Sequence, residues 1–511
     1  MAPESHPSSL HPARFDTLII GAGMAGLSVA FHLLVENDYG GSVAICEARD
    51  RIGGRIVGTD LAGRRVELGA NWIHGLVGNP VYKLAERFGL IDPLAMNAES
   101  GHYGNPNVCG HTSPDGRPVP LATVAHAYDV YFRMVKQCEM LHDRPNASSN
   151  VVDGEKSVGQ RLRRLIDEHL AGRTATERPL WTAMFEQMLQ RECCINGCAD
   201  MEQVSLSSYG AYEELPGGNL VMPGGYTQLI EHMLTAIRRK LTGQSQAKRF
   251  QLLLNHEVQQ IQWIGLAGQD KPGLQIDRDT EYPVRLICHG GQTLLAKHLV
   301  NTMPIGVLKH RLLTTGSSLS SPPHADPPLY SPPLPDYKLR VIQSIGIDVV
   351  NKIYLEYDQS LCPHHWDPMV DELFCINLNS PAPDSKDYKV DQHWTRRIYS
   401  FARLNNRLLL GWVFGKEARH VEQLARQDKG QQLQRQLTDF LRSLTGRRDF
   451  PDPKRVLVTQ WGSDPYSLGS YSFIGVNGSR SNFEELAEPI FADPAQDKVS
   501  DWINRLFSLF T

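Results

Sequence analysis

Three features are scarce in this chain, and each scarcity excludes a class of protein. No apolar stretch among the 511 residues is as long as the roughly 20 residues that a membrane-spanning helix needs, so we expect no membrane span. The net charge is −4, without the basic excess typical of nucleic-acid-binding proteins, so we expect no nucleic-acid partner. Residues 1–13 are polar and lack the apolar core of a secretory signal, which predicts a disordered lead.

Cysteine is also sparse and irregular. The nine cysteines are odd in number and show no regular spacing, unlike a disulfide framework, so we expect a reducing compartment, the cytoplasm. Cys193, Cys194 and Cys198 form the densest group. Zinc sites combine such cysteines with a second pair of ligands or with histidines. The spacing therefore favours thiols in a core or cleft, and we expect no metal site.

What the chain does have is a strand–helix–strand pattern near its start. The apolar run at 16–20 predicts a buried parallel strand, the apolar spacing over 24–35 predicts a helix, and residues 42–46 predict a second strand. This is the order of a βαβ unit in an α/β domain. Because 511 residues are too many for one compact core, we expect two or more domains.

Glycines and one acid stand where such a unit binds a dinucleotide. Between the first strand and the helix lies Gly21-x-Gly23-x-x-Gly26. Gly21 permits a tight turn, Gly23 lets the backbone approach a pyrophosphate, and Gly26 lets the helix pack on the strand. Glu47 follows the second strand, where its carboxylate can accept hydrogen bonds from ribose hydroxyls. The alternative is a glycine-rich turn without a ligand; the two strands and the acid favour the dinucleotide site.

Two further stretches extend this pattern. "ARDRIGGRI" at 48–56 places Gly53-Gly54 and the fixed charge of Arg55 where they could meet a phosphate, and "VELGANWIHG" follows at 66–75. Together with the βαβ unit, these stretches resemble the flavin-containing amine oxidase family, most closely its animal polyamine oxidase and spermine oxidase branch. The resemblance continues through the segments 191–217, 223–234, 256–263, 300–309, 351–358 and 460–473.

The resemblance implies FAD as the cofactor. The glycine turns and Glu47 would hold its diphosphate and ribose, and the backbone of Val258 would meet its adenine. The residues that the resemblance assigns to FAD are Gly21, Gly23, Ala25, Gly26, Glu47, Ala48, Gly53, Gly54, Arg55, Gly69, Ala70, Asn71, Trp72, Val258 and Trp461.

The matched segments also predict how the domains interleave along the chain. We expect an α/β FAD-binding domain with a Rossmann-like βαβ unit, and an α+β substrate-binding domain. The FAD-binding domain would comprise residues 14–95, 220–312 and 405–511, and would be incomplete at its C-terminal end. The substrate-binding domain would comprise residues 96–219 and 313–404.

Lys352, His74 and Glu192 match positions that are catalytic in the family. The matching lysine of the family lies near the flavin and holds a water, and desolvation can lower the pKa of a lysine so that it moves protons. Alternation in "NKIYLEY" puts Lys352, Tyr354 and Glu356 on one strand face, which also suits a surface lysine. For His74 the alternative is a hydrogen-bonded turn residue, and for Glu192 a solvent-facing residue at a helix end.

A polyamine carries several positive charges, so a carboxylate in the substrate tunnel can select which nitrogen is oxidised. The resemblance places His74, Glu192, Ile195 and Tyr471 in that tunnel. Ala211 stands where the branch usually has an acid, which leaves the preferred substrate length open.

The function that the resemblance implies is FAD-dependent oxidation of spermine or an N1-acetylated polyamine at a carbon next to a secondary amine. The partners would be the polyamine and O2, and the products an aldehyde, a shorter amine and H2O2. After residue 480 the family's closing G-E-x-T/S motif is absent, and residues 499–510 have helical spacing instead. We therefore expect weak FAD binding and slow turnover. Alternatives are a non-catalytic family member and an oxidase of another amine, and a peroxisomal location stays open for a longer form.

Overall fold

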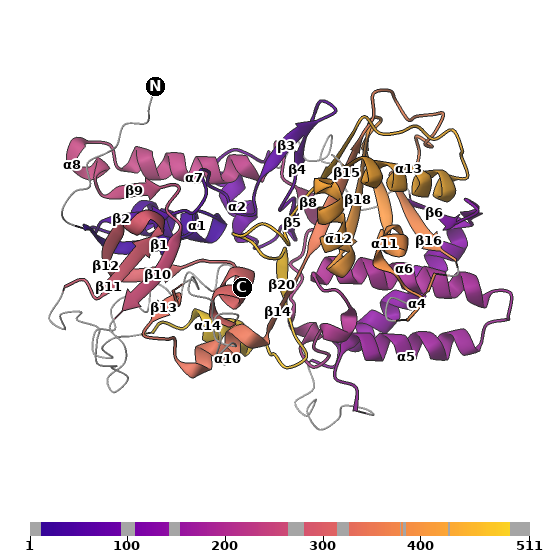
Figure 1. Ribbon diagram of the computed structural model, residues 1–511, viewed down its shortest axis with the longest axis horizontal. Coiled ribbons are helices and arrows are strands. Elements are labelled where there is room, and N and C mark those ends of the chain that lie inside the picture. Colours follow the sequence, from indigo (N-terminus) through magenta and orange to yellow (C-terminus); the bar gives the residue numbers. More distant parts are fainter. Residues whose placement is uncertain are drawn as a thin grey trace.

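The computed structural model describes residues 12–92, 108–142, 154–263, 281–313, 327–378, 380–381, 385–427 and 430–490. Two seven-stranded sheets lie side by side, and helices pack on each of them (Figure 1). Two of the small two-stranded sheets, β14–β20 and β5–β8, lie between the large ones in this view. The structure therefore has the predicted mixed α/β class.

The first sheet contains the predicted βαβ unit. Its strands, in spatial order, are β13 (Tyr330–Ser331), β10 (Val258–Trp263), β11 (Val284–Cys288), β12 (Thr293–Asn301), β1 (Ala13–Ile20), β2 (Val43–Cys46) and β9 (Phe250–Leu253). Because β1 lies parallel to both β12 and β2, Ile20, Cys46 and Asn301 stand side by side at one sheet edge. Open α/β sheets bind their ligands in the crevice at this carboxyl edge.

Strand β1 is buried on both faces, as its unbroken apolar run predicts. Leu18 and Ile19 point to opposite faces, and both are 0% exposed. The strand begins earlier than predicted because the backbone from Ala13 already pairs with β12. The single helix predicted over 24–35 is an α-helix, α1 (Met24–Phe31), that continues as a π-helix over His32–Glu36.

Helix α7 (Tyr226–Lys240) packs beside α1 against the first sheet. It buries an apolar stripe formed by Leu229, Ile230, Met233, Leu234 and Ile237. The other helices of this half are α2 (Pro80–Arg87), α8 (Gln244–Ala247), α9 (Ile305–Leu313), α10 (Asp336–Ser344) and α14 (Ser481–Ala487).

The second sheet lies between two layers of helices (Figure 1). Its strands, in spatial order, are β19 (Arg455–Val458), β15 (Val350–Glu356), β18 (Leu408–Phe414), β17 (Ser400–Asn405), β16 (Glu372–Asn377), β6 (Val108–Ser113) and β7 (Pro118–Val119). One core joins the sheet to α4 (Leu121–Glu139), α5 (Val158–Ala171) and α6 (Arg178–Asn196). A separate core joins it to α12 (Gly415–Arg426) and α13 (Gln431–Thr445), next to the short α11 (Val390–His393).

Small elements connect the two halves. Three two-stranded sheets pair β3 (Gly58–Leu61) with β4 (Arg64–Glu67), β5 (Trp72–His74) with β8 (Asn219–Val221), and β14 (Ile345–Asp348) with β20 (Tyr471–Ile474). Short 3-10 helices occupy Met201–Gln203, Tyr209–Ala211, His289–Gly291 and Trp394–Arg397.

The domain boundary expected at residue 405 differs from the sheet topology. Strands β18 and β19 pair antiparallel with β15, so residues 408–458 belong to the second sheet rather than the first. In the opposite sense, β13 pairs with β10, and Ile342 of α10 lies in a core of the first sheet. These boundaries follow from strand pairing and burial, which join residues far apart in the chain. No change of composition along the sequence marks them.

Among the residues that the structure describes, no helix is both long and apolar enough to cross a membrane. Residues 1–11 of the lead predicted over 1–13, and the predicted helical spacing at 499–510, lie outside the described residues, while Ala13 already belongs to β1.

A buried lysine ties α10 to the end of α14. Lys338 is 3% exposed, and its Nζ donates to the backbone carbonyls of Glu485, Leu486 (3.1 Å) and Glu488 (2.6 Å). The last carbonyls of a helix have no partner within the helix, so the lysine supplies donors to acceptors that α14 itself leaves without one.

Lys338→Met is therefore expected to lower the free energy of unfolding by about 2 kcal/mol, because the end of α14 loses the donor of three hydrogen bonds. Urea unfolding of the full chain measures this loss. Lys309→Met is the matched control, because Lys309 donates to a single carbonyl, that of Gln343 at the end of α10. Equal losses in the two variants would contradict the role of Lys338.

Candidate functional site: the cofactor crevice and its neighbours

The predicted glycine turn lies at the carboxyl ends of β1 and β2. Gly21 has a φ of +98°, and a Cβ on Gly26 would lie 1.9 Å from the carbonyl oxygen of Gly21. At Gly23, in contrast, a Cβ would meet no protein atom nearer than 4.0 Å. No side chain caps the start of α1, so its first N–H groups remain available to a ligand.

A second glycine turn closes against the first. The N–H of Gly53 donates to the carbonyl of Ala22 at 2.8 Å. Gly53 and Gly54 have φ values of +100° and +56°, and a Cβ on Gly54 would lie 3.4 Å from the Cα of Gly23. Two stretches of backbone without side chains thus face each other, which is the kind of cradle that a diphosphate can approach closely.

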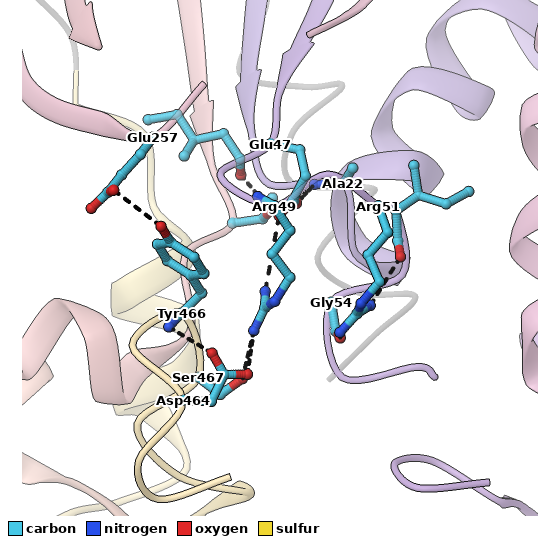
Figure 2. A network of polar contacts seen from close by, with 12 residues as sticks. Ala22, Glu47, Arg49, Arg51, Gly54, Glu257, Asp464, Tyr466 and Ser467 are labelled. Carbon is cyan, nitrogen blue, oxygen red and sulfur yellow. Dashed lines mark hydrogen bonds and ion pairs between the residues drawn. The ribbon is translucent and has the colours of Figure 1, made fainter. Parts of the chain in front are cut away.

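Glu47 is directed at the first glycine turn (Figure 2). Its Oε2 accepts from the N–H of Ala22 at 2.7 Å, and its Oε1 accepts from the N–H of Arg49 at 2.9 Å. The side chain is only 4% exposed. A carboxylate offers about four lone-pair sites, so two backbone bonds fix Glu47 and leave acceptor capacity for ribose hydroxyls.

Arg55 is a cation without an ion-pair partner among the described residues. Its Nη1 donates to the carbonyl of Ser470. Burial lowers the pKa of the Arg55 guanidinium, and the charge of Arg49 lowers it further. A guanidinium that lacks a carboxylate, next to Gly53-Gly54, suits a phosphate group. The open position at Gly23, the paired glycine turns, Glu47 and Arg55 therefore fit a dinucleotide such as FAD.

The predicted adenine segment lies beside Glu47. The N–H of Asn255 donates to the carbonyl of Arg49 at 2.9 Å, and the N–H of His256 donates to the carbonyl of Glu47 at 2.8 Å. Ala48 lies between these two acceptors, and Val258 begins β10 shortly after the two donors. Ala25, in the first turn of α1, is exposed.

The stretch from Gly69 to Trp72 packs on the second glycine turn. A Cβ on Gly69 would lie 1.6 Å from the carbonyl oxygen of Arg55, and the N–H of Ala70 donates to that oxygen at 3.3 Å. The carbonyl of Asn71 accepts from the N–H of Met222, and that of Trp72 accepts from the hydroxyl of Tyr226 at 2.7 Å. The structure thus brings the predicted cofactor residues 53–55 and 69–72 into one contiguous group.

Lys352 meets this group from the second sheet. Its Nζ donates to the carbonyls of Glu67 at 2.7 Å and of Gly69 at 2.8 Å. Burial lowers the pKa of Lys352 to about 8, and the charge of Glu67 opposes part of that shift. The alternative of a surface lysine is therefore wrong.

The strand face predicted for Lys352 is also confirmed. Tyr354 donates to the carbonyl of Glu67 at 2.7 Å, and Glu356 accepts from the N–H of Ala62 at 2.9 Å. Lys352, Tyr354 and Glu356 thus all contact the segment from 62 to 69.

Two charged residues at the site were missed by the sequence analysis. Glu67 is buried and turned toward the start of α7, where a Cβ on Gly225 would lie 2.1 Å from its Oε1. Burial raises its pKa, which the charges of Arg65 and Lys352 oppose. Arg49 donates to Asp464 at 2.5 Å and to Ser467 at 3.1 Å (Figure 2). No spacing rule predicts that pair, because its partners are 415 residues apart in the sequence.

The segment 460–471 connects the predicted cofactor residues to the predicted substrate residues. Trp461 is 7% exposed and donates from Nε1 to the carbonyl of Leu68 at 3.3 Å. Ser470 accepts from Arg55, and the hydroxyl of Tyr471 donates to the carbonyl of Cys194 in α6.

Glu192 is buried near the end of α6 rather than solvent-facing, so that alternative is wrong. It is 5% exposed, and its carboxylate accepts from Arg191 and from the hydroxyl of Tyr209, both at 3.3 Å. Burial raises its pKa, and the charge of Arg191 opposes the rise. Ile195 follows in the last turn of α6 and is exposed, close to the contact that Tyr471 makes with the same turn.

His74 is exposed on the small sheet formed by β5 and β8. Its Nδ1 lies 3.2 Å from Oδ1 of Asn219, which also accepts from the N–H of Gly75. The described hydrogen bonds of His74 thus hold it at the end of β5, and its role at the site stays a prediction.

Comparison with known proteins decides the family. The model of the family described as flavin containing amine oxidoreductase matches residues 24–498. The chain belongs to the flavin-containing amine oxidoreductase family. Human and bovine proteins named peroxisomal N(1)-acetyl-spermine/spermidine oxidase are 31% and 30% identical to this family member over 494 and 495 residues. These matches cover 94% and 93% of this chain and 87% and 86% of the relatives.

Further flavin-containing amine oxidoreductases resemble the chain over most of its length. Polyamine oxidase 1 of Oryza sativa subsp. japonica is 27% identical over 500 residues, which are 93% of this chain and 88% of that protein. A solved putrescine oxidase, a double mutant redesigned for cofactor binding, has a TM-score of 0.56 at 17% identity and covers 94% of this chain and 92% of its own. That likeness shows the shared fold. Family membership confirms the predicted resemblance and FAD as the cofactor.

Glu47→Ala is expected to weaken FAD binding about 10-fold, because the ribose hydroxyls lose a buried acceptor worth about 1–3 kcal/mol. Titration of the flavin-free chain with FAD, followed by flavin fluorescence, gives the dissociation constant. Asp16→Ala is the matched control, since Asp16 bonds to the backbone N–H of Ser42 near the opposite end of β1. Unchanged FAD affinity in Glu47→Ala would show that this carboxylate does not bind the ribose.

Proposed function

We propose that this chain oxidises a polyamine, spermine or an N1-acetylated polyamine, at a carbon next to a secondary amine. The observation that carries the proposal is Lys352, a lysine with a pKa of about 8 held against the segment that packs on the cofactor crevice. The relatives named as acetylpolyamine and polyamine oxidases support the substrate class.

FAD, when bound, supplies the acceptor for a hydride from the carbon next to nitrogen and passes the electrons to O2. The overall reaction consumes the amine, O2 and water, and yields an aldehyde, a shorter amine and H2O2. The described residues that would hold FAD are the two glycine turns with Glu47 and Arg55.

The protein's own residues must bind and deprotonate the amine. An aliphatic amine with a pKa near 10 is almost fully protonated at neutral pH, so the site has to favour its neutral form. Lys352, with its lowered pKa, exchanges protons near neutral pH at the face of β15 that meets residues 67–69.

The substrate is selected by residues near the contact between the end of α6 and β20. Glu192 offers a buried carboxylate to a second, cationic nitrogen of the polyamine. Ile195, Tyr471 and Trp461 provide apolar and aromatic walls that exclude water, and His74 accepts a hydrogen bond from an amine at the tunnel entrance.

We also propose a cytoplasmic location. All nine cysteines are free, and seven of them are buried, which suits a reducing compartment. The alternative is the peroxisomal location named for two relatives. Fractionation of cells that produce the chain would distinguish the two locations.

A peroxide assay over an amine panel tests the proposed function. The chain, reconstituted with FAD, is supplied with spermine, N1-acetylspermine, spermidine, putrescine and benzylamine, and the Lys352→Met variant is the matched control. Peroxide formed fastest from spermine or N1-acetylspermine supports the proposal. Faster reaction with benzylamine or putrescine would show an oxidase of another amine, and stoichiometric FAD without peroxide would show a non-catalytic member.

A further inference from the structure

A connected set of buried polar groups runs from α12 to β15. Glu422 on α12 is 3% exposed, and its Oε1 accepts from Nδ2 of Asn351 at 2.7 Å and from the N–H of Gly462 at 2.8 Å. Asn351 is 0% exposed, and its Oδ1 accepts from the hydroxyl of Thr459 at 3.0 Å and from the N–H of Trp461 at 3.2 Å.

The set ends at the backbones of two residues of the site. The hydroxyl of Thr459 accepts from the N–H of Lys352 at 2.8 Å, while Asn351 accepts from the N–H of Trp461. The side chains of these two residues then hold successive carbonyls: Lys352 those of Glu67 and Gly69, and Trp461 that of Leu68.

The carboxylate in this set is costly to bury. Glu422 accepts here from neutral donors, and Arg419 on the same helix pairs with Asp348 instead. A buried carboxylate persists when its hydrogen bonds are satisfied, and a partly satisfied network would destabilise the fold. The bond from the N–H of Gly462 holds Oε1 of Glu422 in place. The bond from Asn351 then fixes its amide in one orientation, with Nδ2 toward Glu422 and Oδ1 toward Thr459 and Trp461.

We propose that Glu422, Asn351 and Thr459 are positioning residues that fix Lys352 and Trp461 relative to each other and to the carbonyls of residues 67–69. The inference rests on the proposed function for the role of Lys352, but the positioning itself is a property of the chain. The amide of Asn351 accepts from the N–H of Trp461 and from the hydroxyl of Thr459, which in turn accepts from the N–H of Lys352. Loosening any member of the set therefore moves Lys352 and Trp461 together.

Hydrogen exchange of the full chain with FAD added tests the positioning without reference to activity. In Thr459→Val and Glu422→Ala, the peptides covering 350–354 and 459–463 should both exchange about 5-fold faster, the factor that loss of one hydrogen bond produces. Thr459→Ser and Glu422→Gln retain an acceptor and should exchange like the parent. Glu417→Ala is the matched control, because Glu417 is a buried carboxylate on the same helix that bonds to Tyr388 instead.

Flavin reduction measured against pH supplies the second readout. In Thr459→Val the amine-dependent reduction rate should fall about 10-fold and its apparent pKa should move by half a unit or more, since acid–base groups act only when correctly placed. Thr459→Ser should restore both values. In a Lys352→Met background, Thr459→Val should cause no further loss.

Two results would overturn the proposal: faster exchange in only one of the two peptides, or equal acceleration in Glu417→Ala. If Thr459→Val fails to fold, Thr459→Ala replaces it, because it also removes the hydroxyl between Asn351 and the N–H of Lys352 and should accelerate both peptides. Coupled exchange without any effect of Lys352→Met on flavin reduction supports the positioning and counts against the proposed role of Lys352 alone.

Discussion

Gly23→Ala is expected to weaken FAD binding about 100-fold, or about 2.7 kcal/mol, while leaving the flavin-free chain as stable as the parent. The new Cβ meets no protein atom nearer than 4.0 Å, and the φ of −76° at Gly23 suits alanine. The methyl group therefore costs the fold nothing, but it occupies the space through which a pyrophosphate approaches the backbone. Fluorescence titration with FAD and thermal unfolding of the flavin-free chain measure the two effects separately.

Gly26→Ala is the matched control for this prediction. Its Cβ would lie 1.9 Å from the carbonyl of Gly21, so it should destabilise the flavin-free chain as well as weaken FAD binding. The two glycines are three positions apart in one turn, and only the first has free space beside it. If Gly23→Ala bound FAD as the parent does, the crevice beside Gly23 would not be the pyrophosphate site.

Lys352→Met is expected to slow amine-dependent flavin reduction by about 100-fold or more, the usual size of a lost acid–base contribution. Stopped-flow absorbance of the FAD-loaded chain, mixed with spermine without oxygen, measures the rate. In the parent, the rate should rise with pH through about 8. The reason is that the side chain of Lys352 becomes neutral, and able to accept a proton, as the pH passes its pKa. This rise should be absent in Lys352→Met.

Two variants separate proton transfer from the holding of backbone carbonyls. Lys352→Arg keeps a donor to the carbonyls of Glu67 and Gly69, but its guanidinium stays protonated, so the rate should remain low. Tyr354→Phe removes another bond to the carbonyl of Glu67, without removing an acid–base group, and should reduce flavin at close to the parent rate. Full activity in Lys352→Arg would contradict proton transfer by Lys352.

The parts of the site that the sequence predicted are those with a local pattern. The turn at Gly21, Gly23 and Gly26 follows an apolar strand directly, so its position at the sheet edge depends only on neighbouring residues. Alternation along β15 likewise predicted that Lys352 and Tyr354 share a face, and both contact the carbonyl of Glu67.

The parts that could not be predicted depend on residues distant in the sequence. Arg49 meets Asp464 only after the 460–471 segment packs against the end of β2. Glu422 belongs to a helix whose charged residues mostly face solvent, and its burial follows from the packing of α12 on β15. The predicted boundary at 405 differs from the strand pairing for the same reason, since the pairing of β18 with β15 has no counterpart in local composition.

The order of strands in the first sheet determines when, during synthesis on the ribosome, β1 can pair with both of its neighbours. β1 lies between β2 and β12, with Ala13 opposite Leu294, so one neighbour of the strand is translated about 280 residues after it. At about 5–20 residues per second, the nascent βαβ unit waits roughly 15–60 s with one edge of β1 unpaired. An open apolar edge invites pairing with other nascent chains. The interleaved layout thus leaves the early chain open to pairing with other chains until the residues of β12 have been made.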